Sequence, residues 1–105
     1  MVPWLLLYEN FTQTNKTDAD FLQAFGVSPK VAEILWRRIR EGHKIKPVHL
    51  LYALHFLKNY ATLEIHASFF KVTKKTFHLR LWEILDLLHQ NLDEVSHSFS
   101  HSFFW

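Results

Sequence analysis

The chain has no cysteine and only two glycines and three prolines among its 105 residues. Without cysteine, the chain can form no disulfide, thiolate zinc site or cysteine nucleophile, and this composition is typical of an intracellular protein. So little glycine and proline leaves few turn residues for the hairpins of an all-β fold, whereas helix-forming residues are plentiful. The composition therefore predicts an all-α protein, and the length has room for one domain.

Long apolar runs are also absent. The stretch VPWLLLY covers only residues 2–8, and no basic residue precedes it. It is too short to span a bilayer and lacks the charged region of a secretory signal. We therefore expect no membrane partner and no targeting segment, and we expect residues 1–16 to form an irregular, loosely packed arm.

Helix start signals recur along the middle of the chain, each ahead of an apolar pattern of helical period. The expected caps and first-turn prolines are Thr17 or Asp18, Ser28 with Pro29, Pro47, Thr62 and Thr73. They predict five helices, over residues 18–25, 29–41, 47–59, 63–70 and 74–92. We expect these helices to pack as one small bundle within residues 17–94, with Ile34, Leu57 and Leu92 among the inward positions.

The tail over residues 95–105 repeats serine, histidine and phenylalanine without a helical or strand period, and we expect it to be disordered. His97 and His101 have the i, i+4 spacing of a ligand pair. A zinc site needs three or four ligands, however, and the remaining histidines are scattered over different helices. The sequence therefore predicts no metal and no cofactor.

One local pattern occurs twice. Residues 25–28 read FGVS and residues 70–73 read FKVT, 45 positions later. The second copy joins the predicted helices over 63–70 and 74–92, and two helices joined by so short a turn are typical of a helix-turn-helix. Lys71 stands where such a turn commonly holds glycine, so it would have to accept a left-handed backbone conformation.

In a helix-turn-helix, the second helix enters the major groove of DNA by its N-terminal turn. Free backbone N–H groups and positive side chains there favour phosphate or base acceptors. The residues expected to face the nucleic acid are Thr73, Lys74, Lys75 and His78. The alternative is that KVTKK is only a solvated connector between two core helices.

A second basic run extends from Arg37 to Lys46. Arg37 and Arg38 could form a second phosphate-contacting surface, or the run could be a solvated helix end that the helix dipole favours. The acidic residue Glu33 on the same predicted helix is interpreted as a solvated charge partner. Trp36 and Trp82 occupy similar places in the two repeats, and their helical spacing favours core positions over nucleic-acid contact.

The segment over residues 18–94 resembles the N-terminal region of Harbinger-type transposases of the DDE superfamily. The blocks that carry the match are FGVSPKVAEILWRRI, HLLYALHFLKNY, ASFFKVTKKTF and the aromatic residue in LWEIL. In that family this region is a helical, helix-turn-helix-like DNA-binding domain that precedes the nuclease domain. The resemblance implies a DNA-contacting role for Lys71, Lys74, Lys75, His78 and Arg80.

A DDE nuclease holds two metal ions with three carboxylates on an RNase H-like domain, which residues 1–105 do not contain. We therefore expect a truncated transposase-derived protein that binds double-stranded DNA, is not an enzyme and has no small-molecule substrate. It is expected to be intracellular, and nuclear if its source is a eukaryote. The alternatives are a helical module that docks onto a protein partner or a second copy, and a non-functional transposase remnant.

Overall fold

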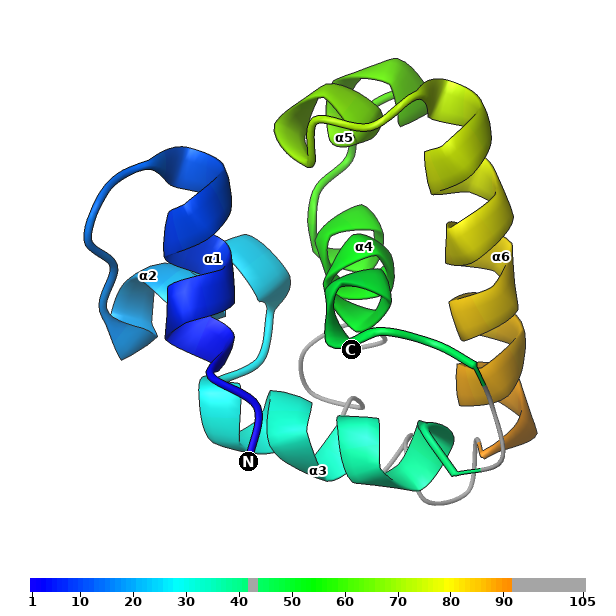
Figure 1. Cartoon of the computed structure of the whole chain (residues 1–105), viewed down its shortest axis with the longest axis horizontal. Coiled ribbons are helices and arrows are strands. Elements are labelled where there is room, and N and C mark those ends of the chain that lie inside the picture. The colour runs from blue at the N-terminus through cyan, green and yellow to red at the C-terminus, as the bar shows by residue number, and fades with distance from the viewer. Residues whose placement is uncertain (42–43, 92–105) are drawn as a thin grey trace.

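The computed structural model describes residues 1–41 and 44–91, and within these ranges it is all helical, as the composition predicts. The helices are α1 (Trp4–Thr12), α2 (Asp18–Phe25), α3 (Pro29–Ile39), α4 (Pro47–Lys58), α5 (Leu63–Phe69) and α6 (Lys74–Gln90). Figure 1 shows α4 in the middle, with α1 and α2 on one side and α6 on the other, while α3 crosses the base of the molecule. The predicted tail lies outside the described residues.

The first helix was not expected, so the prediction of five helices and of an irregular arm over residues 1–16 is wrong for α1. Trp4 and Tyr8 are four residues apart and therefore lie on one face of the helix, where both are buried. The ring of Tyr8 meets Phe21 and Phe25 of α2 edge to face, with centroids 6.1 and 5.1 Å apart. These aromatic contacts hold α1 against the bundle.

The other helices begin where the capping residues predict. Side-chain oxygens of Thr17, Ser28, Thr62 and Thr73 each accept a backbone N–H three residues further on. Each cap satisfies one of the amides that the first turn of a helix leaves unpaired, which stabilises the start by about 1 kcal/mol. Local chemistry therefore determines the start of four of the six helices in the described part of the chain.

The core is centred on α4, whose residues Leu50, Leu51 and Leu54 are fully buried. Helix α4 packs against α2, α5 and α6, so apolar side chains from both halves of the chain meet on it. Two positions that the pattern placed inward are instead exposed, because Ile34 and Leu57 lie at the edge of their apolar stripes. The predicted inward Leu92 lies outside the described residues.

The side chain of Asn59, directly after α4, joins two helix ends. Its amide Nδ2 donates to the backbone oxygen of Ala24 in α2, at 2.9 Å, and to that of His55 in α4, at 3.1 Å. Carbonyl groups in the last turn of a helix have no partner within the helix. The amide thus gives the Ala24 oxygen a partner and adds a second donor to the His55 oxygen, which also accepts the Asn59 backbone N–H at 3.0 Å. It thereby ties the N-terminal half of the chain to α4.

Candidate nucleic-acid interface

The turn between α5 and α6 is closed by its own backbone. The N–H of Val72 donates to the Ala67 oxygen at 3.0 Å, and the N–H of Lys71 donates to the Ser68 oxygen at 3.1 Å. This pair of hydrogen bonds is the Schellman motif, in which the residue after the helix adopts a left-handed conformation. Lys71 has φ 58°, so the left-handed backbone expected from its place in the sequence is present.

The FGVS copy of the pattern makes a related turn between α2 and α3. Gly26 takes the left-handed conformation there, with φ 78°, and its N–H donates to the Leu22 oxygen at 2.8 Å. In both turns the next residue is a valine, and the one after it, Ser28 or Thr73, caps the following helix. The repeated letters therefore correspond to a repeated way of ending one helix and starting the next.

Small and aromatic residues pack α5 against α6. Ala67, Phe70 and Phe77 are buried, and Phe70 and Phe77 stack with their centroids 6.0 Å apart. Phe77 also lies 5.0 Å from the ring of Tyr52 in α4. These contacts anchor the start of α6 to the core, so the lysines around the turn are left on the outside, as the sequence predicts.

The three lysines of the turn differ in their surroundings. Lys74 pairs with Glu64 of α5 at 2.8 Å, and this ammonium holds the pKa of the Glu64 carboxyl below its usual value. Lys71 and Lys75 are exposed, and neither has an ion pair or side-chain hydrogen bond with any residue that the structure describes. Two uncompensated positive charges therefore flank the N-terminal end of α6.

His78 follows one turn later and is joined to Trp82. The indole N–H of Trp82 donates to Nε2 of His78 at 2.7 Å, so the neutral imidazole carries its proton on Nδ1, which has no acceptor among the described residues. The interpretation of Trp82 as a core residue is wrong, because 55% of its surface is exposed, whereas Trp36 is buried as expected. The i, i+4 spacing of His78 and Trp82 was the signal for this contact.

Arg80 lies on another side of α6. It follows His78 by two residues, which turns it by about 200° around the helix axis. Its guanidinium binds both carboxylate oxygens of Glu83 at 3.2 Å. Burial first, and then the positive charge of Arg80, lower the pKa of His49 in α4. The structure therefore places Arg80 beside α4 and not with His78.

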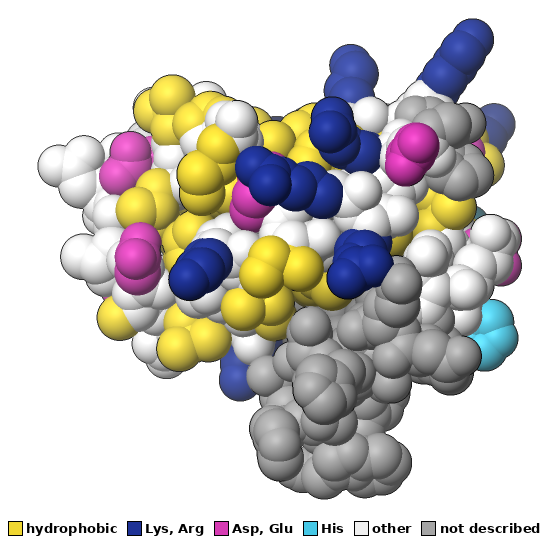
Figure 2. Space-filling model, turned by 90° about the horizontal axis from the view of Figure 1, so that it is seen from below, with side chains coloured by type: hydrophobic (Ala, Val, Ile, Leu, Met, Phe, Trp, Pro, Cys, Tyr) yellow, Lys and Arg dark blue, Asp and Glu magenta, His cyan; other side chains and the backbone are white. Residues whose placement is uncertain are grey.

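The second basic run lies at the opposite end of α6. Figure 1 shows that α6 starts beside α5 and ends beside the C-terminal part of α3, which carries Arg37 and Arg38. A helix rises 1.5 Å per residue, so roughly 24 Å of α6 separates the two regions. Both arginines are exposed, and Figure 2 shows Lys and Arg side chains gathered on the face that α3 forms. The two predicted contact regions are therefore separate surfaces.

Glu33 is the charge partner on its helix that the sequence suggested, because it pairs with Arg37 four residues later, but it is buried and not solvated. Its carboxylate accepts hydrogen bonds from the Val2 backbone N–H at 3.0 Å, the Trp4 indole N–H at 3.1 Å and the Arg37 Nε–H at 2.7 Å. Burial alone would raise its pKa, but these three donors outweigh that effect and hold the pKa below its usual value. Its partners at Val2 and Trp4 lie 29 to 31 residues away in the chain, so only folding reveals the contact.

His55 and His66 form a pair that the sequence did not indicate. Their Nδ1 atoms are 2.7 Å apart, and His66 is fully buried with its Nε2 atom unpartnered. Two nitrogens at this distance share one proton, so one ring donates and the other accepts. Among the described residues, no three potential ligands come together around a metal-sized space, and the pair has no third ligand. His97 and His101 lie outside the described residues.

Within the described ranges, no helix has both the length and the apolar character needed to cross a membrane. Comparison of the chain with protein-family models, with curated proteins and with solved structures found no match. Function is therefore argued from the geometry of the α5–α6 turn and from the sequence pattern that specifies it.

Proposed function

We propose that the chain binds double-stranded DNA, with α5 and α6 acting as a helix-turn-helix and the first turn of α6 facing the major groove. The observation that carries this proposal is the placement of the lysines. Positive charge at the N-terminus of a helix opposes the helix dipole, and a lysine in a left-handed position is less favourable than glycine. Features that cost local stability are found mainly at functional sites.

The same turn offers neutral donors for a phosphate. The Thr73 hydroxyl accepts the N–H of Thr76, and the first helical N–H to find a carbonyl oxygen belongs to Phe77. The backbone N–H groups of Lys74 and Lys75 therefore point outward without a protein acceptor in the described structure. These two N–H groups and the ammonium groups of Lys71 and Lys75 form a surface suited to binding one phosphate group.

His78 is the residue of this surface best suited to a base edge. Its Nδ1–H points away from the indole that occupies Nε2, so it can donate to O6 or N7 of guanine. Lys74 can join it by exchanging the exposed carboxylate of Glu64 for DNA. In this proposal Arg80 supports the helix from its other side. Arg37 and Arg38 belong to α3, beside the far end of α6, and are too distant from its first turn to share the groove.

The sequence resemblance to the N-terminal region of Harbinger-type transposases supports the same assignment. The proposed protein is a transposase-derived DNA-binding chain without nuclease activity, located in the nucleus if the source is eukaryotic. Two acidic residues on α6 contact neighbouring side chains of the same helix. Glu83 is paired with Arg80, and Asp86 accepts a hydrogen bond from Gln90.

The test is a double substitution, Lys74→Ala with Lys75→Ala, measured for duplex affinity by fluorescence anisotropy and for stability by thermal melting. Each lost phosphate contact should lower the slope of log affinity against log salt by about 0.9, so the double variant should lose up to roughly 1.8. Melting should be unchanged or slightly improved, because Thr73 caps α6 without either lysine. Lys30→Ala with Lys58→Ala removes the same charge from other helices and is the matched control.

Equal affinities for the double variant and its parent would contradict the proposal, and so would equal losses in the double variant and its control. The first result would mean that the lysines are only a solvated turn. The second would mean that net charge, and not this surface, attracts the duplex. An unfolded double variant would contradict the assignment of the α6 start to the Thr73 cap, and with it the role proposed for the lysines.

A second candidate function rests on the exposed apolar side chains of α6. Leu79 and Trp82 are three residues apart on the outer face, and each exposes 55% of its surface. Paired exposed side chains of this size favour contact with a protein partner or a second copy. Sedimentation of the parent and of Leu79→Ser at several concentrations distinguishes the two functions, because only self-association depends on Leu79 and on concentration.

A further inference from the structure

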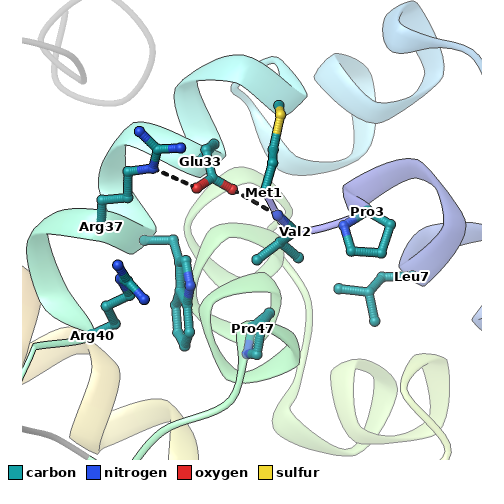
Figure 3. Close-up of a pocket in the computed structure, with 9 residues that line it drawn as sticks. Met1, Val2, Pro3, Leu7, Glu33, Arg37, Arg40 and Pro47 are labelled. Carbon is teal, nitrogen blue, oxygen red and sulfur yellow. Dashed lines mark hydrogen bonds and ion pairs between the residues drawn. The ribbon is translucent and has the colours of Figure 1, made fainter.

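A groove on the far side of the molecule from the α6 start is lined by α1, α3 and the beginning of α4. Its volume is about 600 Å³. Val2, Leu7, Trp36 and Pro47 give it an apolar lining, while Arg37 borders it from the last turn of α3 and Arg40 from the position directly after α3. Figure 3 shows these arginines on one side of the groove, with Val2, Leu7 and Pro47 across from them. A second hollow of about 530 Å³ shares Trp36, Arg37 and Arg40 and continues past Ile45.

The two arginines are held in different ways. Arg37 is oriented by its Nε bond to Glu33, and 63% of its side-chain surface stays exposed, so the outer nitrogens of its guanidinium remain available. The backbone N–H of Arg40 donates to the Trp36 oxygen at 2.9 Å, but its guanidinium has no hydrogen bond or ion pair with any residue in the described parts of the chain. Glu33 is already occupied by Val2, Trp4 and Arg37. The groove therefore has fixed apolar walls and spare positive charge.

We propose that this groove binds a peptide segment of a protein partner in which acidic and large apolar residues lie close together. The carboxylates of such a segment would pair with Arg40 and with the outer nitrogens of Arg37, in the bidentate geometry that guanidinium and carboxylate share. An adjacent apolar side chain would lie on Trp36 and Pro47. Glu41 borders the second hollow, and its negative charge restricts the acidic part of the segment to the Arg40 side.

The shape and lining favour a peptide over a nucleic acid. Phosphates of duplex DNA approach a convex, cationic surface and bring no apolar group with them. The indole of Trp36 and the ring of Pro47 would gain nothing from such a ligand, whereas an apolar side chain on them removes surface from water. Charge complementarity and the apolar lining thus point to one ligand class, and this site is independent of the DNA surface on α6.

The test uses a fluorescein-labelled synthetic peptide in which Glu and Asp alternate with Leu and Phe, and anisotropy measured against the full chain. Two control peptides replace the acidic residues by Gln and Asn, or the apolar residues by Ser. We expect saturable binding of the first peptide and at least tenfold weaker binding of both controls. Arg40→Ala should weaken the first peptide by about tenfold or more, because it removes the bidentate partner of the carboxylate.

Lys30→Ala is the matched control, because Lys30 is an exposed cation near the other end of α3 and does not line the groove. It should change peptide affinity less than twofold. Arg40→Ala is preferable to Arg37→Ala because it leaves the ion pair between Arg37 and Glu33 in place. An unchanged melting temperature of Arg40→Ala would confirm that its fold is intact. Duplex affinity measured on Arg40→Ala should match that of the parent, which separates this site from the proposed DNA surface.

Four results would overturn the proposal. They are the absence of saturable peptide binding, equal binding of the charged and neutral peptides, equal affinities of Arg40→Ala and its parent, and parallel loss of peptide and duplex binding in Arg40→Ala. The last result would make the groove part of the DNA surface. Failure of the Lys74 and Lys75 test together with intact peptide binding would refute the DNA proposal alone.

Discussion

Lys71 offers a direct measurement of what a left-handed lysine costs this fold. A left-handed backbone costs an L-residue about 1–2 kcal/mol, and glycine avoids most of this cost. Glycine also makes the unfolded chain more flexible, which offsets about 0.5–1 kcal/mol. With φ at 58° and the side chain exposed, Lys71→Gly should therefore raise the free energy of unfolding by about 0.5–1 kcal/mol. For a domain of this size the melting temperature should rise by roughly 2–5 °C.

Lys71→Ala separates the backbone from the charge. Alanine keeps the β-carbon and hence the left-handed cost, but it removes the same positive charge as glycine does. The glycine variant should thus be the more stable of the two by about 0.5–1 kcal/mol in urea unfolding, while both should lose duplex affinity equally. Gly26→Ala at the equivalent turn should be destabilising by about 1 kcal/mol or more, because Gly26 is left-handed and buried.

Two results would refute this reasoning. If Lys71→Gly is no more stable than Lys71→Ala, the turn is not left-handed in solution and the parallel with Gly26 fails. If both variants bind DNA as tightly as the parent, the ammonium of Lys71 does not contact the duplex. A stabilised variant with weakened DNA binding would show that this position exchanges stability for function.

Phe77 is fully buried, so Phe77→Ala should lower the free energy of unfolding by about 3–5 kcal/mol in urea titrations, whereas exposed Leu79→Ala should change it by less than about 0.5 kcal/mol. Burial, followed by the neighbouring His66, lowers the pKa of His55 to about 4 from an ordinary 6.5, and burial lowers that of His66 as well. Between these pH values the unfolded chain binds more protons than the native chain, so stability should fall as the pH is lowered through this window, and a flat profile would contradict the buried pair. Glu33→Gln should cost about 1–3 kcal/mol in thermal melting, because it removes the charge that Arg37 and two further donors share, and an unchanged melting temperature would show that this carboxylate is dispensable.

Much of the fold could be predicted because the residues that start and end its helices act locally. The threonine and serine caps, the prolines and the left-handed position of Lys71 all act within four residues, and the structure has each of them. Helix α1 was missed because Pro3 gives no side-chain cap and the apolar residues that follow surround the helix. Its stability comes from Tyr8 packing on α2, a contact that no local pattern shows.

The two candidate sites differ in the same way, because one follows from local sequence and the other only from the packing of helices. The exposed lysines of the α5–α6 turn were predictable from the sequence because the Thr73 cap and the buried Phe70 and Phe77 fix their places by spacing alone. The groove beside Arg40 was not, since its walls come from three helices and Glu33 bridges segments 29 to 31 residues apart. The outward position of Trp82 and the pairing of His55 with His66 likewise depend on how helices pack, which periodicity alone does not determine.

The amide of Asn59 also affects how the molecule opens. The side chain of Asn59 donates to the oxygens of both Ala24 and His55. When the last turn of α4 frays, Asn59 moves away and the Ala24 oxygen at the end of α2 loses its hydrogen bond. Local openings of these two segments are therefore coupled, although 35 residues separate Ala24 from Asn59. In hydrogen exchange, the backbone amides in the last turns of α2 and α4 should become accessible as one unit.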